Sequence, residues 1–351
     1  MSKVNQSEAG SFNTFLPEGC KLCQMGAKMV LFVTGICPRD CFYCPVSPER
    51  RSEVVYANER PVNSDRDIIE EARQMSALGT GITGGEPLLK LENVLHYIRL
   101  LKSEFGKEHH IHLYTSLAPD NDTIARLVDA GLDEIRFHPP VNIWSSIEKS
   151  SYSMSIEYAK AHGLQVGIEV PAIEGIEKLA EFTESMDCFL NLNELEFSDS
   201  NAEDMKLRGY LLENDTSNAV AGSQEIARKA VLFAGKMHFC SSTYKDAVQL
   251  RKRLIRIAQN TARDFDDITE DGTIIYGQVV CKDENSMQRV IECLLEQEVP
   301  EEMIENSASK IETAWWILED LSELIRQNTD EMFIVERYPF EKGLIVEKIP
   351  V

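Results

Sequence analysis

The chain alternates short runs of apolar, often β-branched residues with longer stretches in which apolar residues recur every three or four positions. Runs of the first kind predict β-strands, and stretches of the second kind predict amphipathic helices. Seven strands are predicted in this way, at 28–36, 80–84, 110–116, 133–138, 165–171, 189–197 and 236–242. Helical stretches lie between them, so the order is that of repeated βα units with a parallel sheet.

This order predicts an α/β fold, and we expect a partial (β/α)6-7 parallel barrel rather than a flat, doubly wound sheet. In either architecture the reacting groups belong at the carboxyl ends of the strands. From about residue 264 the pattern changes to an Asp-Gly hairpin signal in "TEDGT", two helices and two strands, which predicts a small α+β domain. The expected parts are therefore an N-terminal lead at 1–27, the barrel at 28–263 and the small domain at 264–351.

Composition limits the functions that this fold can serve. The 351 residues are 43% apolar, which is enough for one large and one small core. The 58 acidic and 36 basic residues give a formal charge of −22, which disfavours an RNA-binding module. No apolar stretch approaches the roughly 18 residues of a membrane span. Nine cysteines after a polar N-terminus predict a cytoplasmic protein with reduced or metal-bound thiols.

Three of these cysteines stand directly after the first predicted strand, in "GICPRDCFYCPVSPER". Cys37, Cys41 and Cys44 fall within eight residues. Thiolates at such spacing favour an iron–sulfur cluster, with zinc or buried structural cysteines as alternatives. The gaps of three and then two residues differ from those of ferredoxins, and no fourth cysteine follows. A four-iron cluster on this loop would keep one iron accessible.

The loop resembles the C-x3-C-x-φ-C hallmark of the radical S-adenosylmethionine (SAM) superfamily, with Tyr43 as the aromatic residue φ. Over about 28–200 the chain is similar to archaeal iron–sulfur oxidoreductases related to pyruvate formate-lyase activating enzyme. The resemblance implies that SAM binds the open iron of a [4Fe-4S] cluster. It also implies that reductive cleavage gives a 5′-deoxyadenosyl radical, which abstracts hydrogen from a substrate. An electron donor such as ferredoxin or flavodoxin is then a partner.

A second motif, "GITGGEP" at 81–87, follows the second strand and resembles the GGE motif that binds the SAM amine in this family. We expect Gly84 and Gly85 to let the backbone approach a ligand closely, Glu86 to offer a carboxylate to the ammonium, and Pro87 to stiffen the exit. The resemblance implies further SAM contacts at later strand ends, from Thr115, Ser116, Arg136, His138 and Glu169. Pairing of Arg136 with a neighbouring acid is the alternative.

A second metal site is also a candidate. Cys20 and Cys23 form a C-x2-C turn, which commonly places two thiolates on one metal. The strand at 236–242 would put His238 and Cys240 on one face. Cys20, Cys23 and Cys240, with His238 as a further donor, could hold an auxiliary iron–sulfur cluster or zinc; the alternative is reduced thiols. The histidines of "HHIH" lie at a strand start, so we interpret them as structural.

The sequence leaves the substrate open between a small molecule, a peptide and RNA, and it assigns no catalytic residue. Arg251 and Arg253, in the helix after the seventh strand, favour an anionic substrate, with a solvated helix face as the alternative. A non-enzymatic alternative is an electron-transfer or cluster-carrier protein that uses the cysteine loop without SAM.

Overall fold

The computed structural model describes residues 4–340 and 342–351, so the first three residues of the predicted lead lie outside the described part. The chain divides into two compact units. The first contains the described residues up to Arg73 and Ala77–Leu250, and the second contains Gln74–Ser76 and Arg251–Val351. Helix α10 (Arg251–Thr261), which the sequence assigned to the barrel, groups with the second unit. Among the described helices, none has the length and apolar character needed to cross a membrane.

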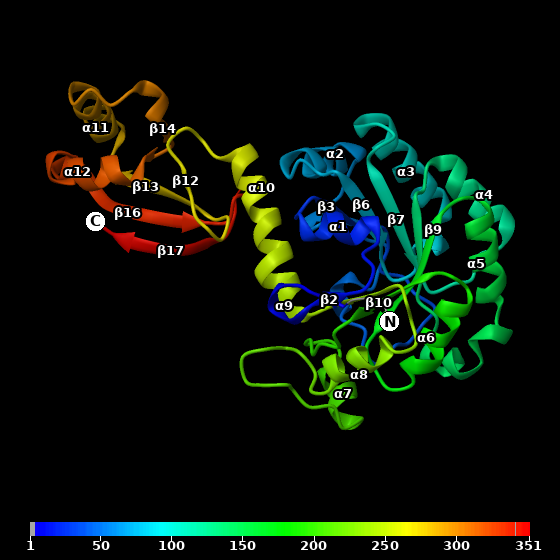
Figure 1. The fold of residues 1–351 in the computed structure, drawn as a ribbon. Coiled ribbons are helices and arrows are strands. Elements are labelled where there is room, and N and C mark those ends of the chain that lie inside the picture. The colour runs from blue at the N-terminus through cyan, green and yellow to red at the C-terminus, as the bar shows by residue number, and fades with distance from the viewer. Residues whose placement is uncertain (1–3, 341) are drawn as a thin grey trace. The chain divides into compact units, whose positions relative to one another are not determined.

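The first unit is built on a sheet in which seven strands run parallel and lie side by side in chain order (Figure 1). They are β3 (Lys28–Phe32), β6 (Gly79–Thr83), β7 (His110–Thr115), β8 (Glu134–Phe137), β9 (Gln165–Pro171), β10 (Phe189–Asn193) and β11 (Met237–Cys240). Each corresponds to one of the seven predicted strands. The first and last of them carry additional antiparallel strands, so the sheet stays open. The predicted α/β fold with a partial parallel barrel is confirmed.

Helices connect these strands and cover the outer face of the sheet (Figure 1). They are α2 (Asp65–Gln74), α3 (Leu91–Phe105), α4 (Asn121–Ala130), α5 (Ser151–Ala161) and α6 (Ile176–Ser185). Helix α4 shows how the sequence sets such bounds. Asp120 accepts a hydrogen bond from the Thr123 backbone N–H at 2.9 Å and caps the first turn, and Gly131, with φ of 111°, ends the helix.

The two faces of the sheet differ in character. Phe137 points outward and packs edge-on against Tyr152 of α5, with ring centroids 6.0 Å apart. Its neighbour Arg136 points inward and lies opposite Tyr114 of β7 in the ladder. Successive side chains of a strand alternate between faces, so one face forms the apolar core while the inner face carries polar groups. The inner face therefore leads directly to the candidate site.

Shorter elements lie at the two edges of the sheet and at the starts of its parallel strands. The sequence did not predict them. A hairpin of β4 (Tyr56–Ala57) and β5 (Arg60–Pro61) pairs with β3, while β1 (Asn5–Gln6) and β2 (Phe12–Asn13) extend the β11 edge. Helix α1 (Glu18–Gln24) packs against β3, β6 and β7. Its Gly19 N–H donates to Glu134, the first residue of β8, at 3.2 Å. Helix α1 therefore covers the strand starts, opposite the carboxyl ends.

The second unit contains an antiparallel sheet in the order β14-β15-β13-β16-β17, with β12 also paired to β13. Its strands are β12 (Asp267–Ile268), β13 (Ile274–Cys281), β14 (Ile304–Ser307), β15 (Lys310–Thr313), β16 (Thr329–Arg337) and β17 (Ile345–Pro350). Helices α11 (Glu284–Glu296) and α12 (Trp315–Ile325) supply the rest of its core. The Asp-Gly hairpin is confirmed, with Gly272 at φ of 84°. The β14–β15 hairpin was not predicted, because its turn contains Ala308 at φ of 49° rather than glycine.

Candidate active site

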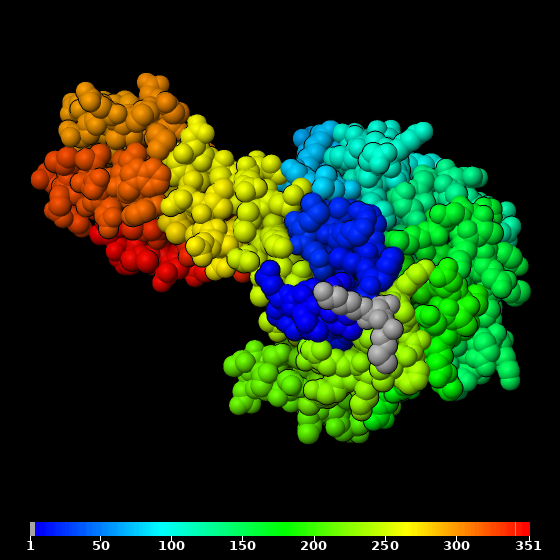
Figure 2. Space-filling view, viewed as in Figure 1, coloured from blue at the N-terminus to red at the C-terminus, as the bar shows by residue number. Residues whose placement is uncertain are grey.

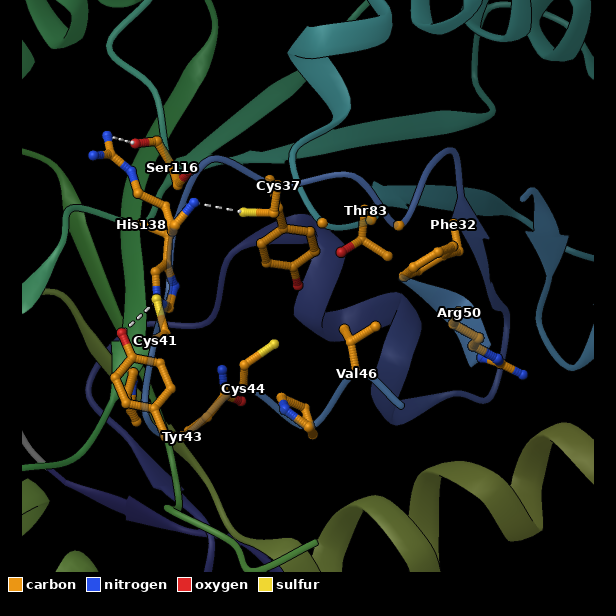
Figure 3. A pocket seen from close by; sticks show the side chains of 18 of the residues that line it. Phe32, Cys37, Cys41, Tyr43, Cys44, Val46, Arg50, Thr83, Ser116 and His138 are labelled. Carbon is orange, nitrogen blue, oxygen red and sulfur yellow. Dashed lines mark hydrogen bonds between the residues drawn. The ribbon is translucent and has the colours of Figure 1, made fainter. Parts of the chain in front are cut away.

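The carboxyl ends of the parallel strands surround a cavity of about 1130 Å³. Its wall includes the cysteine loop after β3, the ends of β6, β7, β9 and β10, and Lys245 shortly after β11. Charged and polar side chains from several strands reach this space (Figure 3). The cavity therefore lies where the strand order predicts reacting groups.

Three cysteines of one loop line this cavity. Cys37 is exposed, Cys41 and Cys44 are half-buried, and all three are free thiols. Figure 3 shows their side chains around one side of the cavity. The loop is turned by a hydrogen bond from the Cys44 N–H to the Cys41 carbonyl at 2.9 Å. The described lining residues include no fourth cysteine, so the donor set fits a four-iron cluster with one open iron.

The glycine loop after β6 lies backbone to backbone against the start of the cysteine loop. The Gly85 N–H donates to the Thr34 carbonyl at 2.6 Å, and the Glu86 N–H donates to the Ile36 carbonyl at 2.8 Å. A Cβ at Gly85 would lie 2.6 Å from the Ile36 oxygen, and one at Gly84 would lie 2.5 Å from the Thr34 oxygen. The two glycines are thus needed for the contact between the two loops, whereas the sequence assigned them to ligand approach alone.

Glu86 is fully buried, and its carboxylate accepts hydrogen bonds from within the chain. Oε1 accepts from the Thr115 hydroxyl at 2.8 Å, and Oε2 accepts from the Ser116 N–H at 2.6 Å and the Ser116 hydroxyl at 2.7 Å. It does not belong to the described cavity lining, although Gly84, Thr115 and Ser116 do. Glu86 thus ties the glycine loop to the end of β7, and its expected contact with the SAM ammonium stays a prediction.

Tyr43, the aromatic residue between Cys41 and Cys44, joins the cysteine loop to the end of β8. Its hydroxyl lies 2.9 Å from His138 Nε2, and both residues line the cavity (Figure 3). Burial raises the pKa of Tyr43 and lowers the pKa of His138, so both rings are neutral at pH 7. The hydroxyl also forms a hydrogen bond with the Cys41 sulfur (Figure 3). His138 thus has a second role beside the cofactor contact expected from the sequence.

Replacing Tyr43 with phenylalanine is expected to lower the free energy of unfolding by about 1 kcal/mol, because the hydrogen bonds of its hydroxyl with His138 and Cys41 are lost. Urea unfolding of the iron-free protein measures the change. Tyr158→Phe, at a half-buried position of α5, is the matched control. An unchanged free energy in Tyr43→Phe would mean that the hydroxyl contributes nothing to holding the loop.

Comparison with known proteins agrees with this geometry. Residues 31–146 match the model of the radical SAM superfamily, and residues 272–351 match a domain of unknown function, DUF8061. The chain is 40% identical over 353 residues to a Methanocaldococcus jannaschii protein named "Putative glycyl-radical enzyme activating enzyme MJ0021", covering 96% of this chain and 93% of that protein. The chain belongs to the radical SAM superfamily. Membership implies a [4Fe-4S] cluster and SAM.

Among solved structures, this radical SAM protein is similar to methylornithine synthase (PylB). The TM-score is 0.41 at 13% sequence identity, over 58% of this chain and 62% of that chain.

Arg136 of this radical SAM protein lies in the interior instead of on the cavity wall. It is 1% exposed, bonds Glu134, and donates to Glu169 at 2.7 Å and to the Tyr114 hydroxyl at 3.0 Å. The described lining includes Glu169 but not Arg136. Arg136 thus pairs with acids, as in the alternative that the sequence left open, and its expected contact with SAM stays a prediction. A buried guanidinium is stable here because two carboxylates compensate its charge.

Glu169 lies on the cavity floor between strands β8 and β10. Besides Arg136, it accepts hydrogen bonds from Asn191 at 3.0 Å and from Asn193 at 2.8 Å. Burial alone would raise its pKa, but the nearby Arg136 lowers it overall. Glu169 is thus an anion held in a fixed position, and its place on the wall is compatible with the expected contact to a cofactor hydroxyl.

The structure does not bring the thiols of the candidate second metal site close enough together to share one metal ion. In the described parts of the chain, the one set of three candidate ligands within 4.8 Å of one another is His110, His112 and Glu134. Cys20, Cys23 and Cys240 form no such set, and the Cys20 sulfur accepts a hydrogen bond from Asn191 at 3.2 Å. This spacing disfavours zinc on these thiols, and an auxiliary cluster stays a prediction.

The histidine set belongs to the polar packing at the strand starts. His110 Nδ1 lies 2.8 Å from the Lys28 ammonium, and Glu134 already bonds Arg136. Two cationic side chains beside the set oppose a further cation, which agrees with the structural interpretation of "HHIH".

Several charged residues on the cavity wall were missed by the sequence analysis, among them Arg39 and Lys245. Arg39, inside the cysteine motif, donates to the Ser116 carbonyl at 2.9 Å. Lys245 forms an ion pair with Glu196; burial alone would lower its pKa, but Glu196 and Cys240 raise it. Lys245 also begins a π-helical turn, Lys245–Leu250, a feature frequent at functional sites. The available signal was a lysine shortly after a predicted strand end.

Proposed function

We propose that this protein cleaves SAM reductively at a [4Fe-4S] cluster held by Cys37, Cys41 and Cys44, and abstracts hydrogen from a substrate. The observation that carries the proposal is the position of three free thiols from one loop on the wall of one large cavity. A non-enzymatic cluster carrier would not require a cavity of about 1130 Å³ beside its cysteines.

The residues around the cavity have distinct roles in this proposal. The three thiolates hold the cluster, which together with SAM would supply the 5′-deoxyadenosyl radical. The glycine loop lies against the cysteine loop, so its backbone groups are candidates for the SAM amine. His138, Thr115, Ser116 and Glu169 remain candidate cofactor contacts because they line the wall. The fixed polar groups of the floor orient a ligand and reduce its contact with water.

The substrate class is proposed separately. The described cavity lining contains as many acidic as basic side chains: Asp40, Glu169, Glu194 and Glu196 against Arg39, Arg50, Arg51 and Lys245. Arg251 and Arg253 are not part of that lining. We keep an anionic substrate as the proposal, and the basic groups of the wall, rather than Arg251 and Arg253, are its candidate partners.

A second candidate function is activation of a glycyl-radical enzyme, in which the hydrogen comes from a glycine of a partner protein. It is favoured by the name of the M. jannaschii relative, which is similar along 96% of this chain and not only in its radical SAM region.

The test is anaerobic reconstitution with iron and sulfide, followed by incubation with SAM and dithionite. Chromatography should show 5′-deoxyadenosine and methionine at a rate well above that of a mixture without dithionite. A full cluster that yields no deoxyadenosine would refute SAM cleavage and favour an electron-transfer protein. Comparing metabolites, tRNA nucleosides and peptides of deletion and parent cells would then distinguish the substrate classes.

A further inference from the structure

Two neighbouring arginines, Arg50 and Arg51, follow the cysteine loop and line the large cavity. Their backbone is fixed to the start of that loop. The Gly35 N–H donates to the Ser52 carbonyl at 2.8 Å, and the Arg50 carbonyl lies so close to Gly35 that a Cβ there would collide with it. Gly35 is only two residues before Cys37, so the arginine pair is anchored directly beside the proposed cluster site.

In the described part of the chain, the partners of both guanidinium groups are neutral. The Arg50 guanidinium lies over the Tyr56 ring, 4.2 Å from its centroid. Arg51 uses its Nε to donate to the Val46 carbonyl at 3.2 Å. These contacts hold the two side chains in place without compensating their charge. A guanidinium held in this way presents the forked N–H groups that bind carboxylates and phosphates.

Acidic side chains near this pair in the sequence do not neutralise it. Glu49 and Glu53 flank the arginines, but both are exposed and neither belongs to the cavity lining. Glu53 instead bonds Lys90 at 2.5 Å. The lining as a whole has as many acids as bases, yet its lysine, Lys245, is paired with Glu196. The arginine pair therefore keeps its positive charge for a ligand.

The cavity wall beside the arginines is apolar. Phe32 and Val46 line the cavity near Arg50, and Figure 3 shows this group across the cavity from Ser116. Phe32 also packs edge-on against Tyr56, the ring that holds Arg50, with ring centroids 6.5 Å apart. An apolar wall lowers the local dielectric constant and strengthens an ion pair formed at its edge. This side of the cavity thus fits a ligand with an apolar body and an anionic end.

The opposite end of the sheet is covered by the N-terminal residues. Helix α1 and the short strands before it, drawn in dark blue, form one surface in Figure 2, and α1 packs against β3, β6 and β7. The arginine pair lies on the segment that follows β3, at the carboxyl ends of the strands. A ligand of the cavity therefore enters at the end where the arginines lie.

We propose that Arg50 and Arg51 bind the anionic group of the substrate, a small molecule whose apolar part lies against the neighbouring aromatic and aliphatic side chains. The anionic group is a carboxylate or a phosphate. Arg39, a further basic residue of the wall, donates to the Ser116 carbonyl and so belongs to the side where SAM contacts are expected. The inference rests on the proposed function, because the ligand is a substrate only if a radical forms beside it.

The test measures binding of hexanoate, hexyl phosphate and hexanamide to the reconstituted full-length protein by calorimetry, with and without SAM and without reductant. At least one anion should bind about tenfold more tightly than hexanamide, which has no charge. Arg50→Gln and Arg51→Gln should each weaken anion binding about tenfold. Arg51 is exposed, so its variant tests the site even where loss of the Arg50–Tyr56 contact disturbs the fold. Arg99→Gln, an exposed position on α3, is the matched control and should bind like the parent.

The tighter of the two anions identifies the group as a carboxylate or a phosphate, and either result supports the site. SAM should leave the affinity for the anions unchanged. If SAM displaces them, the arginines bind the carboxylate of SAM and the substrate proposal is wrong. Equal binding of hexanamide, parental binding in both arginine variants, or no binding of any probe to the parent overturns it as well.

Failure of this inference and failure of the proposed function give different results. If the anions bind beside SAM but the reduced protein forms no deoxyadenosine, SAM cleavage is refuted while the anion site stands. If deoxyadenosine forms but the anions do not bind, SAM cleavage stands and the anion site is overturned.

Discussion

Replacing Cys41 with alanine is expected to abolish both the four-iron cluster and the production of 5′-deoxyadenosine from SAM. Cys37, Cys41 and Cys44 are the three cysteines that line the described cavity, so the variant retains two protein ligands. Iron and sulfide per chain, together with the electron paramagnetic resonance signal after reduction, measure the loss. Deoxyadenosine should fall to the level of the mixture without dithionite, because the chemistry depends on the cluster.

The matched control for this prediction is Cys293→Ala. Cys293 is a half-buried free thiol on α11 of the second unit, so its loss should leave iron content and SAM cleavage at parental levels. A Cys41→Ala variant that still carries a full cluster would show that another donor replaces the thiolate. The set of cluster ligands would then differ from the three cysteines proposed here.

The parallel strands could be predicted because their signal is local. Each is a short β-branched run separated from the next by a stretch with helical spacing, and such alternation needs no knowledge of distant residues. The edge strands lack this signal. Strands of two residues, such as Tyr56–Ala57 and Phe12–Asn13, have no period to detect, and they form because a neighbouring edge offers them partners.

The site could be predicted as a set of strand ends, but the bonds within it could not. Thr115, Ser116, His138 and Glu169 do line the cavity. Whether a charged side chain meets a ligand or another side chain depends on residues far away in the chain. Glu86 receives its donors from a strand about 30 residues later, and nothing in "GGEP" indicates them.

The inner face of the sheet explains why the sequence left two roles open for Arg136. The alternation of side chains along β8 places Arg136 on the inner face of the sheet, opposite Tyr114, and this is the face that the cavity adjoins. Its side chain is buried outside the cavity lining, where Glu134 and Glu169 compensate its charge. This ion-pair network in turn fixes Glu169, so a buried residue without contact to the cavity positions one that lines it.

The second prediction concerns the contact between the glycine loop and the cysteine loop. Replacing Gly85 with alanine is expected to prevent normal cluster assembly and to lower the free energy of unfolding by about 1–3 kcal/mol, the usual cost of overpacking. The added Cβ would lie 2.6 Å from the Ile36 oxygen and 2.7 Å from the Gly35 oxygen. Both are backbone atoms at the start of the cysteine loop, so they can yield only if the loop moves. Iron per chain after reconstitution and urea unfolding of the iron-free protein measure the two effects.

Gly235→Ala is the matched control, because its Cβ would meet the flexible Glu184 carboxylate at 3.1 Å, which can move aside. This variant should assemble the cluster normally. If Gly85→Ala also held a full cluster with unchanged stability but bound SAM more weakly in calorimetry, the glycine would serve ligand approach, as the sequence alone implies. Loss of iron before any SAM is added would instead show that Gly85 holds the cysteine loop in place, because the defect then precedes cofactor binding.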